Sequence, residues 1–101
     1  MSLALKFTRE AKADVASIVA WYRRENAVIG DRFKRTMAEK ITAVRAMPTL
    51  YPIVRGTTRR LLLNPFPYDV YYRHGQGEVI VIAILHQHRA PGFILQRLQK
   101  H

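Results

Sequence analysis

The sequence contains no cysteine, so neither disulfide bonds nor thiolate chemistry is available to it. No stretch approaches the ~20 consecutive apolar residues of a transmembrane helix. The first seven residues alternate apolar and polar positions and lack the apolar block of a signal peptide. These absences predict a cytoplasmic protein that makes no use of a membrane.

Acidic residues are also scarce: 7 Asp and Glu stand against 17 Lys and Arg, which gives a net charge of +10. The basic residues are spread along the chain, so a basic tail is not the source of this charge. Such an imbalance in a small domain predicts an anionic partner, either nucleic acid, an acidic protein or both. With 101 residues, of which 49% are apolar, the chain is long enough for a single folded domain over residues 1–101.

Apolar periodicity predicts an α+β fold in the order β-α-α-β-β-β. A short strand ending near Phe7 precedes a helix that Thr8 can cap, and a second helix follows over Ala27–Met47. The short connection between these helices predicts an antiparallel helical hairpin, packed on a mostly antiparallel sheet. The expected sheet strands are Arg59–Leu63, Tyr68–Arg73 and Glu78–Leu85, with a turn over His74–Gly77 and a short C-terminal helix over Phe93–His101.

The last expected strand is apolar at every position from Val79 to Leu85, so it should be interior to the sheet. Strict alternation would place Val79, Val81, Ala83 and Leu85 on one face and Ile80, Ile82 and Ile84 on the other. The helical hairpin can cover only one of these faces. The other must be closed by the C-terminal segment, by a curled sheet or by another chain.

Basic and imidazole side chains gather near the expected strand ends and form the candidate site: Arg59, Arg60, Arg73, His86, His88 and Arg89. Such a cluster could bind a phosphate backbone while His86 moves a proton. Solvated arginines at strand ends explain the same pattern, and the spacing does not choose between the two interpretations. Ser/His/Asp and glycine-rich phosphate-loop patterns are both absent.

His86 and His88 are two residues apart, as a pair of metal ligands would be, but further ligands are scarce. The second half of the chain holds only two acids, Asp69 and Glu78. We therefore expect no metal site and no cofactor. The same scarcity leaves catalysis without an evident second proton-transfer group beside His86.

Three segments together resemble the RelE/ParE toxin superfamily of bacterial type II toxin–antitoxin modules: Arg59-Arg60 before the second strand, Phe66-Pro67-Tyr68 into the third, and the ending from Val79 to Arg89. The likeness runs from Phe7 to about Leu98. The Pro-Tyr strand entry and the ending Ile84-Leu85-His86 are more similar to the ParE branch.

The ParE resemblance implies a non-enzymatic toxin that binds DNA gyrase and is neutralised by a cognate antitoxin with an acidic segment, in a toxin–antitoxin hetero-oligomer. The RelE branch implies the alternative, a ribosome-dependent mRNA endoribonuclease, for which Arg60, His86 and Arg89 would be the catalytic residues. That branch often has a tyrosine near the C-terminus, whereas no tyrosine follows Tyr72 here and His101 is a poor substitute. A non-toxic basic nucleic-acid-binding module is the third interpretation.

Overall fold

A computed structural model describes residues 3–99. Its elements, in chain order, are β1 (Ala4–Phe7), α1 (Arg9–Glu25), α2 (Ala27–Ala46), β2 (Ile53–Arg55), β3 (Thr58–Leu62), β4 (Tyr68–Gly75), β5 (Glu78–His86) and α3 (Pro91–Gln99). They form a five-stranded sheet in the order β1-β5-β4-β3-β2, in which β1 pairs in parallel with β5 and the other pairs are antiparallel. The predicted α+β class, the helical hairpin and the interior position of the apolar strand are confirmed.

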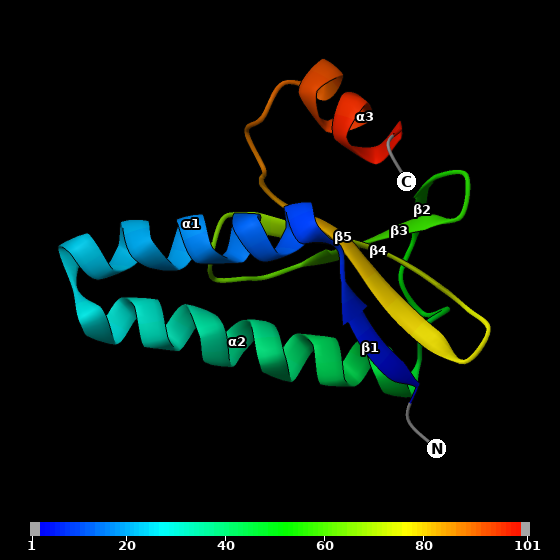
Figure 1. Cartoon of the computed structure of the whole chain (residues 1–101), viewed down its shortest axis with the longest axis horizontal. Coiled ribbons are helices and arrows are strands. Elements are labelled where there is room, and N and C mark those ends of the chain that lie inside the picture. The colour runs from blue at the N-terminus through cyan, green and yellow to red at the C-terminus, as the bar shows by residue number, and fades with distance from the viewer. Residues whose placement is uncertain (1–2, 100–101) are drawn as a thin grey trace.

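The two helices of the hairpin begin where the sequence indicates, because each has a capping side chain. The Thr8 hydroxyl accepts a hydrogen bond from the Ala11 amide, and the Asn26 side chain accepts one from the Val28 amide. Asn26 is in extended conformation and serves both as the C-cap of α1 and as the N-cap of α2. One residue therefore turns the chain, and α1 and α2 run antiparallel side by side (Figure 1).

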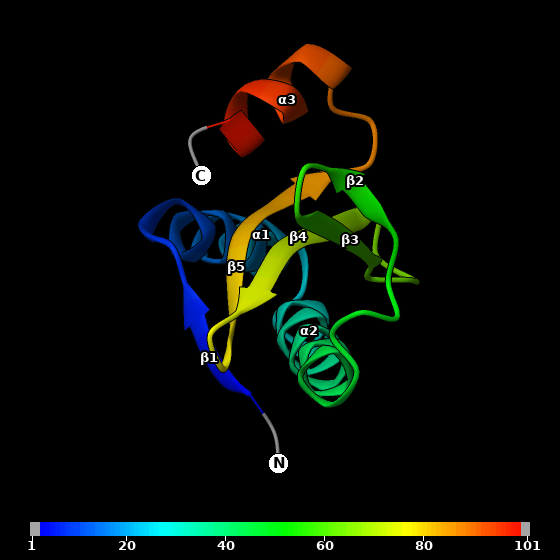
Figure 2. The ribbon, with the colours of Figure 1, turned by 90° about the vertical axis from the view of Figure 1, so that its right-hand side faces the viewer.

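The two faces of the sheet have separate cores. Figure 2 shows α3 on one side of the sheet and α2 on the other. The hairpin face is filled by a large cluster that includes Phe33, Phe66, Tyr72 and Ile84. The α3 face holds a small cluster of Tyr71, Ile82, Ala83, Leu85 and Leu98. Of the three expected ways to close the second face, the C-terminal segment is the one observed. The last two residues of the helix expected there, Lys100 and His101, lie outside the described residues.

The predicted assignment of β5 side chains to the two faces is wrong beyond Ile82. Tyr72 pairs with Val81 and Tyr71 with Ala83, so Ile82 is the extra residue of a β-bulge. The bulge inverts the alternation: Val79, Val81 and Ile84 face the hairpin, whereas Ile82, Ala83 and Leu85 face α3. A continuous apolar run carries no sign of the inversion, because every position remains apolar.

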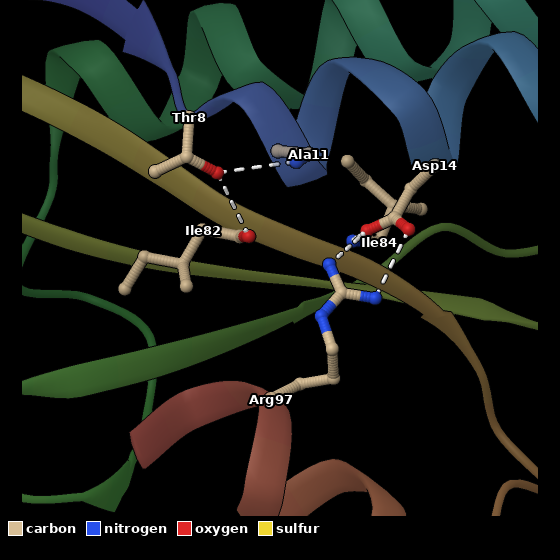
Figure 3. A network of polar contacts seen from close by, with 6 residues as sticks. All are labelled: Thr8, Ala11, Asp14, Ile82, Ile84 and Arg97. Carbon is tan, nitrogen blue, oxygen red and sulfur yellow. Dashed lines mark hydrogen bonds and ion pairs between the residues drawn. The ribbon is translucent and has the colours of Figure 1, made fainter. Parts of the chain in front are cut away.

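The side chains of Thr8, which caps α1, and of Asp14 within α1 complete the hydrogen bonding of β5 where β1 ends. β1 pairs with β5 as far as Phe7 and Val81. Beyond that point the Thr8 hydroxyl donates to the Ile82 carbonyl, and Asp14 accepts from the Ile84 amide at 3.0 Å (Figure 3). Thr8 thus caps α1 and stabilises the bulge with the same hydroxyl.

The β4–β5 turn and strand β2 differ most from prediction, whereas the other boundaries shift by one or two residues. The turn between β4 and β5 is only Gln76 and Gly77, both with positive φ, because His74 and Gly75 continue the strand. β2 was not predicted at all. It has three exposed residues and no alternating burial, so its apolar side chains carry no period for sequence reasoning to detect.

Candidate functional site

Two hollows lie on either side of the point where the chain enters α3. The histidine pocket, of about 460 Å³, lies between α1, the end of β5 and α3, and is lined by Asp14, Ser17, Tyr68, Ile84, Leu85, His86, His88, Arg89, Phe93 and Arg97. The arginine pocket, of about 320 Å³, lies between β2, β3 and α3, and is lined by Val54, Arg55, Arg60, Tyr71, Gln87, Arg89, Pro91, Ile94, Leu95 and Leu98. Arg89 lines both pockets and connects them into one basic surface.

His86 stands at the end of β5 with one ring nitrogen already engaged. Its Nδ1 accepts a hydrogen bond of 3.0 Å from the His88 amide. The ring also lies 5.2 Å from the centroids of both the Tyr68 and the His88 rings. An acceptor at Nδ1 places the proton of the neutral imidazole on Nε2, so the free nitrogen of His86 is a donor. In this arrangement His86 can bind an anion but does not offer a general base.

Arg89 is positioned by an aromatic ring and not by an acid. Its guanidinium carbon lies 4.6 Å from the centroid of the Phe93 ring, a cation–π contact to the first turn of α3. Burial raises the pKa of the nearby Tyr68, while the positive charge of Arg89 lowers it. Arg89 is exposed, so its charge is available to an anionic partner.

The arginine pocket has a buried acid beneath it. Asp69 is 4% exposed and accepts a hydrogen bond from the Gln87 side chain at 3.1 Å. Arg60 Nε lies 3.9 Å from the same carboxylate, at the limit of an ion pair. Burial raises the pKa of Tyr71 on the pocket floor, with the negative charge of Asp69 adding to the rise. Arg60 is thus oriented by Asp69 while its side chain stays 44% exposed.

Asp14, the acidic residue that lines the histidine pocket, is also hydrogen-bonded through both of its carboxylate oxygens. Arg97 makes two hydrogen bonds to Asp14, Nη1 to Oδ1 at 3.1 Å and Nη2 to Oδ2 at 2.7 Å. Asp14 Oδ2 also accepts the Ile84 amide (Figure 3). This forked arrangement joins α1, β5 and α3, and it leaves no carboxylate of the pocket lining free for proton transfer.

The structure brings together four of the six predicted site residues. Arg60, His86, His88 and Arg89 line the two connected pockets. Arg59 does not join them: its Nη1 donates to the Tyr51 and Thr49 carbonyls and holds the loop before β2. Arg73 lies toward the far end of the sheet, next to the β4–β5 turn, in a separate hollow. The expected convergence is therefore wrong for Arg59 and Arg73.

Sequence reasoning missed other residues of this surface, among them Arg55, Tyr68 and Arg97. Arg55 lies on β2, a strand that was not predicted. Arg97 lies in the predicted C-terminal helix, but no partner was predicted for it. A signal existed for Arg97, because Asp14 interrupts the α1 sequence as an acid flanked by small apolar residues. An acid among apolar residues of a helix needs a cationic partner, which must then come from elsewhere in the chain.

Residues 3–99 contain neither a cluster of metal-ligating side chains nor a helix that could span a membrane. No three His, Cys, Asp or Glu side chains there are grouped to hold a metal ion. The helices of this part of the chain are all too short or too polar to cross a bilayer.

Comparison with known proteins identifies the family. Residues 5–91 match the model of the ParE toxin of the type II toxin–antitoxin system parDE. Among solved structures, a chain of the chromosomal ParDE TA system from P. aeruginosa is similar with a TM-score of 0.73. The two chains share 20% identity over 84% of this chain and 96% of the other. No curated protein matches. Because the family model covers most of the sequence, the predicted membership is confirmed, and the chain belongs to the ParE toxin family of type II toxin–antitoxin systems.

Proposed function

We propose that this toxin inhibits DNA gyrase by binding to it, without chemistry of its own. The observation that carries the proposal is the hydrogen bonding around the basic surface. Both carboxylates there, Asp14 and Asp69, are bonded to structural partners, and His86 Nδ1 is occupied by the His88 amide. Cations are available, but metal-free cleavage of RNA also needs a base and an acid.

Arg60, Arg89 and His86 are the residues that we expect to contact the target. Arg60 and Arg89 extend from the sheet and from the entry to α3, and the His86 Nε2–H is a third donor on the same surface. Guanidinium groups pair with carboxylates and phosphates in a planar, two-bonded geometry. Both gyrase and its DNA substrate offer such groups. Because gyrase acts in the cytoplasm, we place the action of the toxin there.

An acidic antitoxin is the second part of the proposal. The net charge of +10 and the exposed apolar side chains of the chain fit a partner that supplies negative charge and covers apolar surface. Such a partner would hold the toxin in a hetero-oligomer. The solved relative is itself described as a ParDE toxin–antitoxin system.

Two parallel assays test the target. We expect the purified protein to block DNA supercoiling by gyrase and to leave translated mRNA intact. Cleavage of translated mRNA with normal supercoiling would instead assign the endoribonuclease activity, with His86, Arg60 and Arg89 as its residues. DNA binding without either effect, and without a growth defect on expression, would favour the non-toxic nucleic-acid-binding module.

A further inference from the structure

One edge of the sheet is only half covered. β2 pairs with β3 at Ile53–Arg59 and Arg55–Thr58. The last backbone hydrogen bond along this edge runs from the Arg60 amide to the Pro52 carbonyl, at 3.1 Å. β3 continues to Leu62, two residues beyond this hydrogen bond.

The peptide groups of Leu62 point to this open edge. In an antiparallel ladder the backbone groups of successive residues face opposite neighbours. The Arg60 amide faces Pro52, and the Leu63 amide donates in the opposite direction to the Tyr68 carbonyl. The N–H and C=O of Leu62 therefore face away from β4, and the Leu62 side chain is 44% exposed.

A basic hollow of about 340 Å³ lies beside the same edge. Lys40 of α2 and Arg60 supply its charge, Tyr51 and Leu62 supply apolar surface, and no acidic residue lines it. The other edge of the sheet, at β1, carries charged side chains that disfavour the docking of a further strand. Lys6 stands in the middle of β1 and pairs with Glu78, and the Leu3 carbonyl accepts a hydrogen bond from Arg45 Nε. A charged side chain on an edge strand disfavours the docking of another strand.

We infer that the open edge of β3 at Leu62 is a docking site for an extended segment of the acidic partner protein. The segment would exchange hydrogen bonds with the Leu62 N–H and C=O, place apolar side chains against Leu62 and Tyr51, and direct its carboxylates to Lys40 and Arg60. This inference rests on the proposed acidic antitoxin and names the surface that its extended part would occupy.

A short synthetic peptide of Glu-Glu-Val-Val repeats is a suitable probe, because each face of the extended peptide then carries both residue types, with a Lys-Lys-Val-Val peptide as its control. NMR hydrogen exchange of the whole protein measures the effect at single amides. The glutamate peptide should slow exchange of the Leu62 amide, and the lysine peptide should not. Protection confined to β1 or to the hairpin, or equal effects of the two peptides, would overturn the inference.

Matched variants test the backbone contact. Leu62→Pro removes the outward N–H without removing a bond to β4, and proline is tolerated at such edge positions. It should weaken peptide binding about tenfold, whereas Leu62→Ala, which keeps the N–H, should bind within about threefold of the parent. Lys40→Glu should weaken binding by several-fold and does not depend on whether the proline variant folds. Undiminished binding by Lys40→Glu or by a folded Leu62→Pro would overturn the inference.

A gyrase inhibition assay distinguishes failure of the docking site at Leu62 from failure of the proposed function. Leu62→Pro should inhibit supercoiling as the parent does. A parent protein that binds the peptide at Leu62 but leaves gyrase active would contradict the proposed target alone. Normal gyrase inhibition with no protection at Leu62 would contradict the docking site alone.

Discussion

The two faces of the sheet are built from the same strands, yet one is densely packed by the helical hairpin and the other is thinly covered by α3. On the hairpin face, four rings from α1, α2 and β4 with its preceding loop meet at centroid distances of 5.2–6.3 Å: Tyr22, Phe33, Phe66 and Tyr68. On the α3 face, Leu98 is the one buried residue that the helix contributes. Stability should therefore come from the hairpin face, whereas the arginine pocket lies on the thinly covered face and the histidine pocket lies at its border with α1.

The largest expected effect comes from the centre of the hairpin face. Phe33 is fully buried among aromatic rings, so Phe33→Ala should lower the free energy of unfolding by about 3–5 kcal/mol. Urea denaturation followed by circular dichroism measures this loss. Phe33→Leu is the matched control, with a smaller loss expected. A loss below about 1 kcal/mol for Phe33→Ala would show that this face is not the main core.

The ion pair between α1 and α3 should give the next largest effect. Asp14→Ala removes the partner of Arg97 and leaves the Ile84 amide without its acceptor, so a loss of about 2–3 kcal/mol is expected. Arg97→Ala keeps the bond to Ile84 and should cost about 1 kcal/mol. Hydrogen exchange distinguishes the two variants, because only Asp14→Ala should expose the Ile84 amide. Equal exchange in both would contradict this division of roles.

Alkaline pH should weaken the hairpin face through Tyr72. Burial raises the pKa of Tyr72 to about 12, and its hydroxyl donates to the Pro48 carbonyl at 2.7 Å. Between the ordinary tyrosine pKa of ~10 and this value, the unfolded chain loses a proton that the folded chain retains. The stabilisation is thus complete below pH ~10 and falls by up to about 2 kcal/mol as the pH rises to ~12.

Tyr72→Phe is the control for this titration, since it removes the ionising group. Burial also raises the pKa values of Tyr22, Tyr68 and Tyr71, so part of the alkaline loss should remain in the variant. Denaturation at a series of pH values from 8 to about 11.5 makes the comparison. An identical pH dependence in the parent and in Tyr72→Phe would contradict the assignment to Tyr72.

The smallest global effect is expected from α3. A helix of nine residues is marginal by itself, and Leu98 is its one buried side chain. Leu98→Ala should release the helix locally, so the global free energy of unfolding should fall by only about 1 kcal/mol while the amides of α3 exchange much faster. A loss as large as that of Phe33→Ala would make the two faces energetically equivalent.

Sequence reasoning succeeded where the pattern is local and periodic. Thr8 caps the first long helix as predicted, the second begins at Ala27 as predicted, and the apolar run of β5 identifies an interior strand. It failed where position depends on tertiary contacts. The bulge at Ile82 is stabilised by Thr8, far away in the sequence, and no spacing within the strand encodes it.

The same distinction applies to the site. His86, His88 and Arg89 follow one another at a strand end, so their proximity could be predicted. Arg59 and Arg60 are adjacent in sequence, yet strand geometry sends their side chains to opposite faces, one to a loop and one to a pocket. Arg73 is separated from the site by the length of β4, which extends farther than predicted.

We propose that the basic surface formed by the two pockets binds gyrase through its cations, independently of the stability supplied by the hairpin face. Gyrase supercoiling inhibition by Arg89→Ala, measured beside its urea denaturation curve, tests this claim most directly. Arg89 is exposed and held by a contact to Phe93, so the variant should unfold like the parent and lose inhibition by about tenfold or more. Undiminished inhibition by a normally folded Arg89→Ala protein would contradict the account.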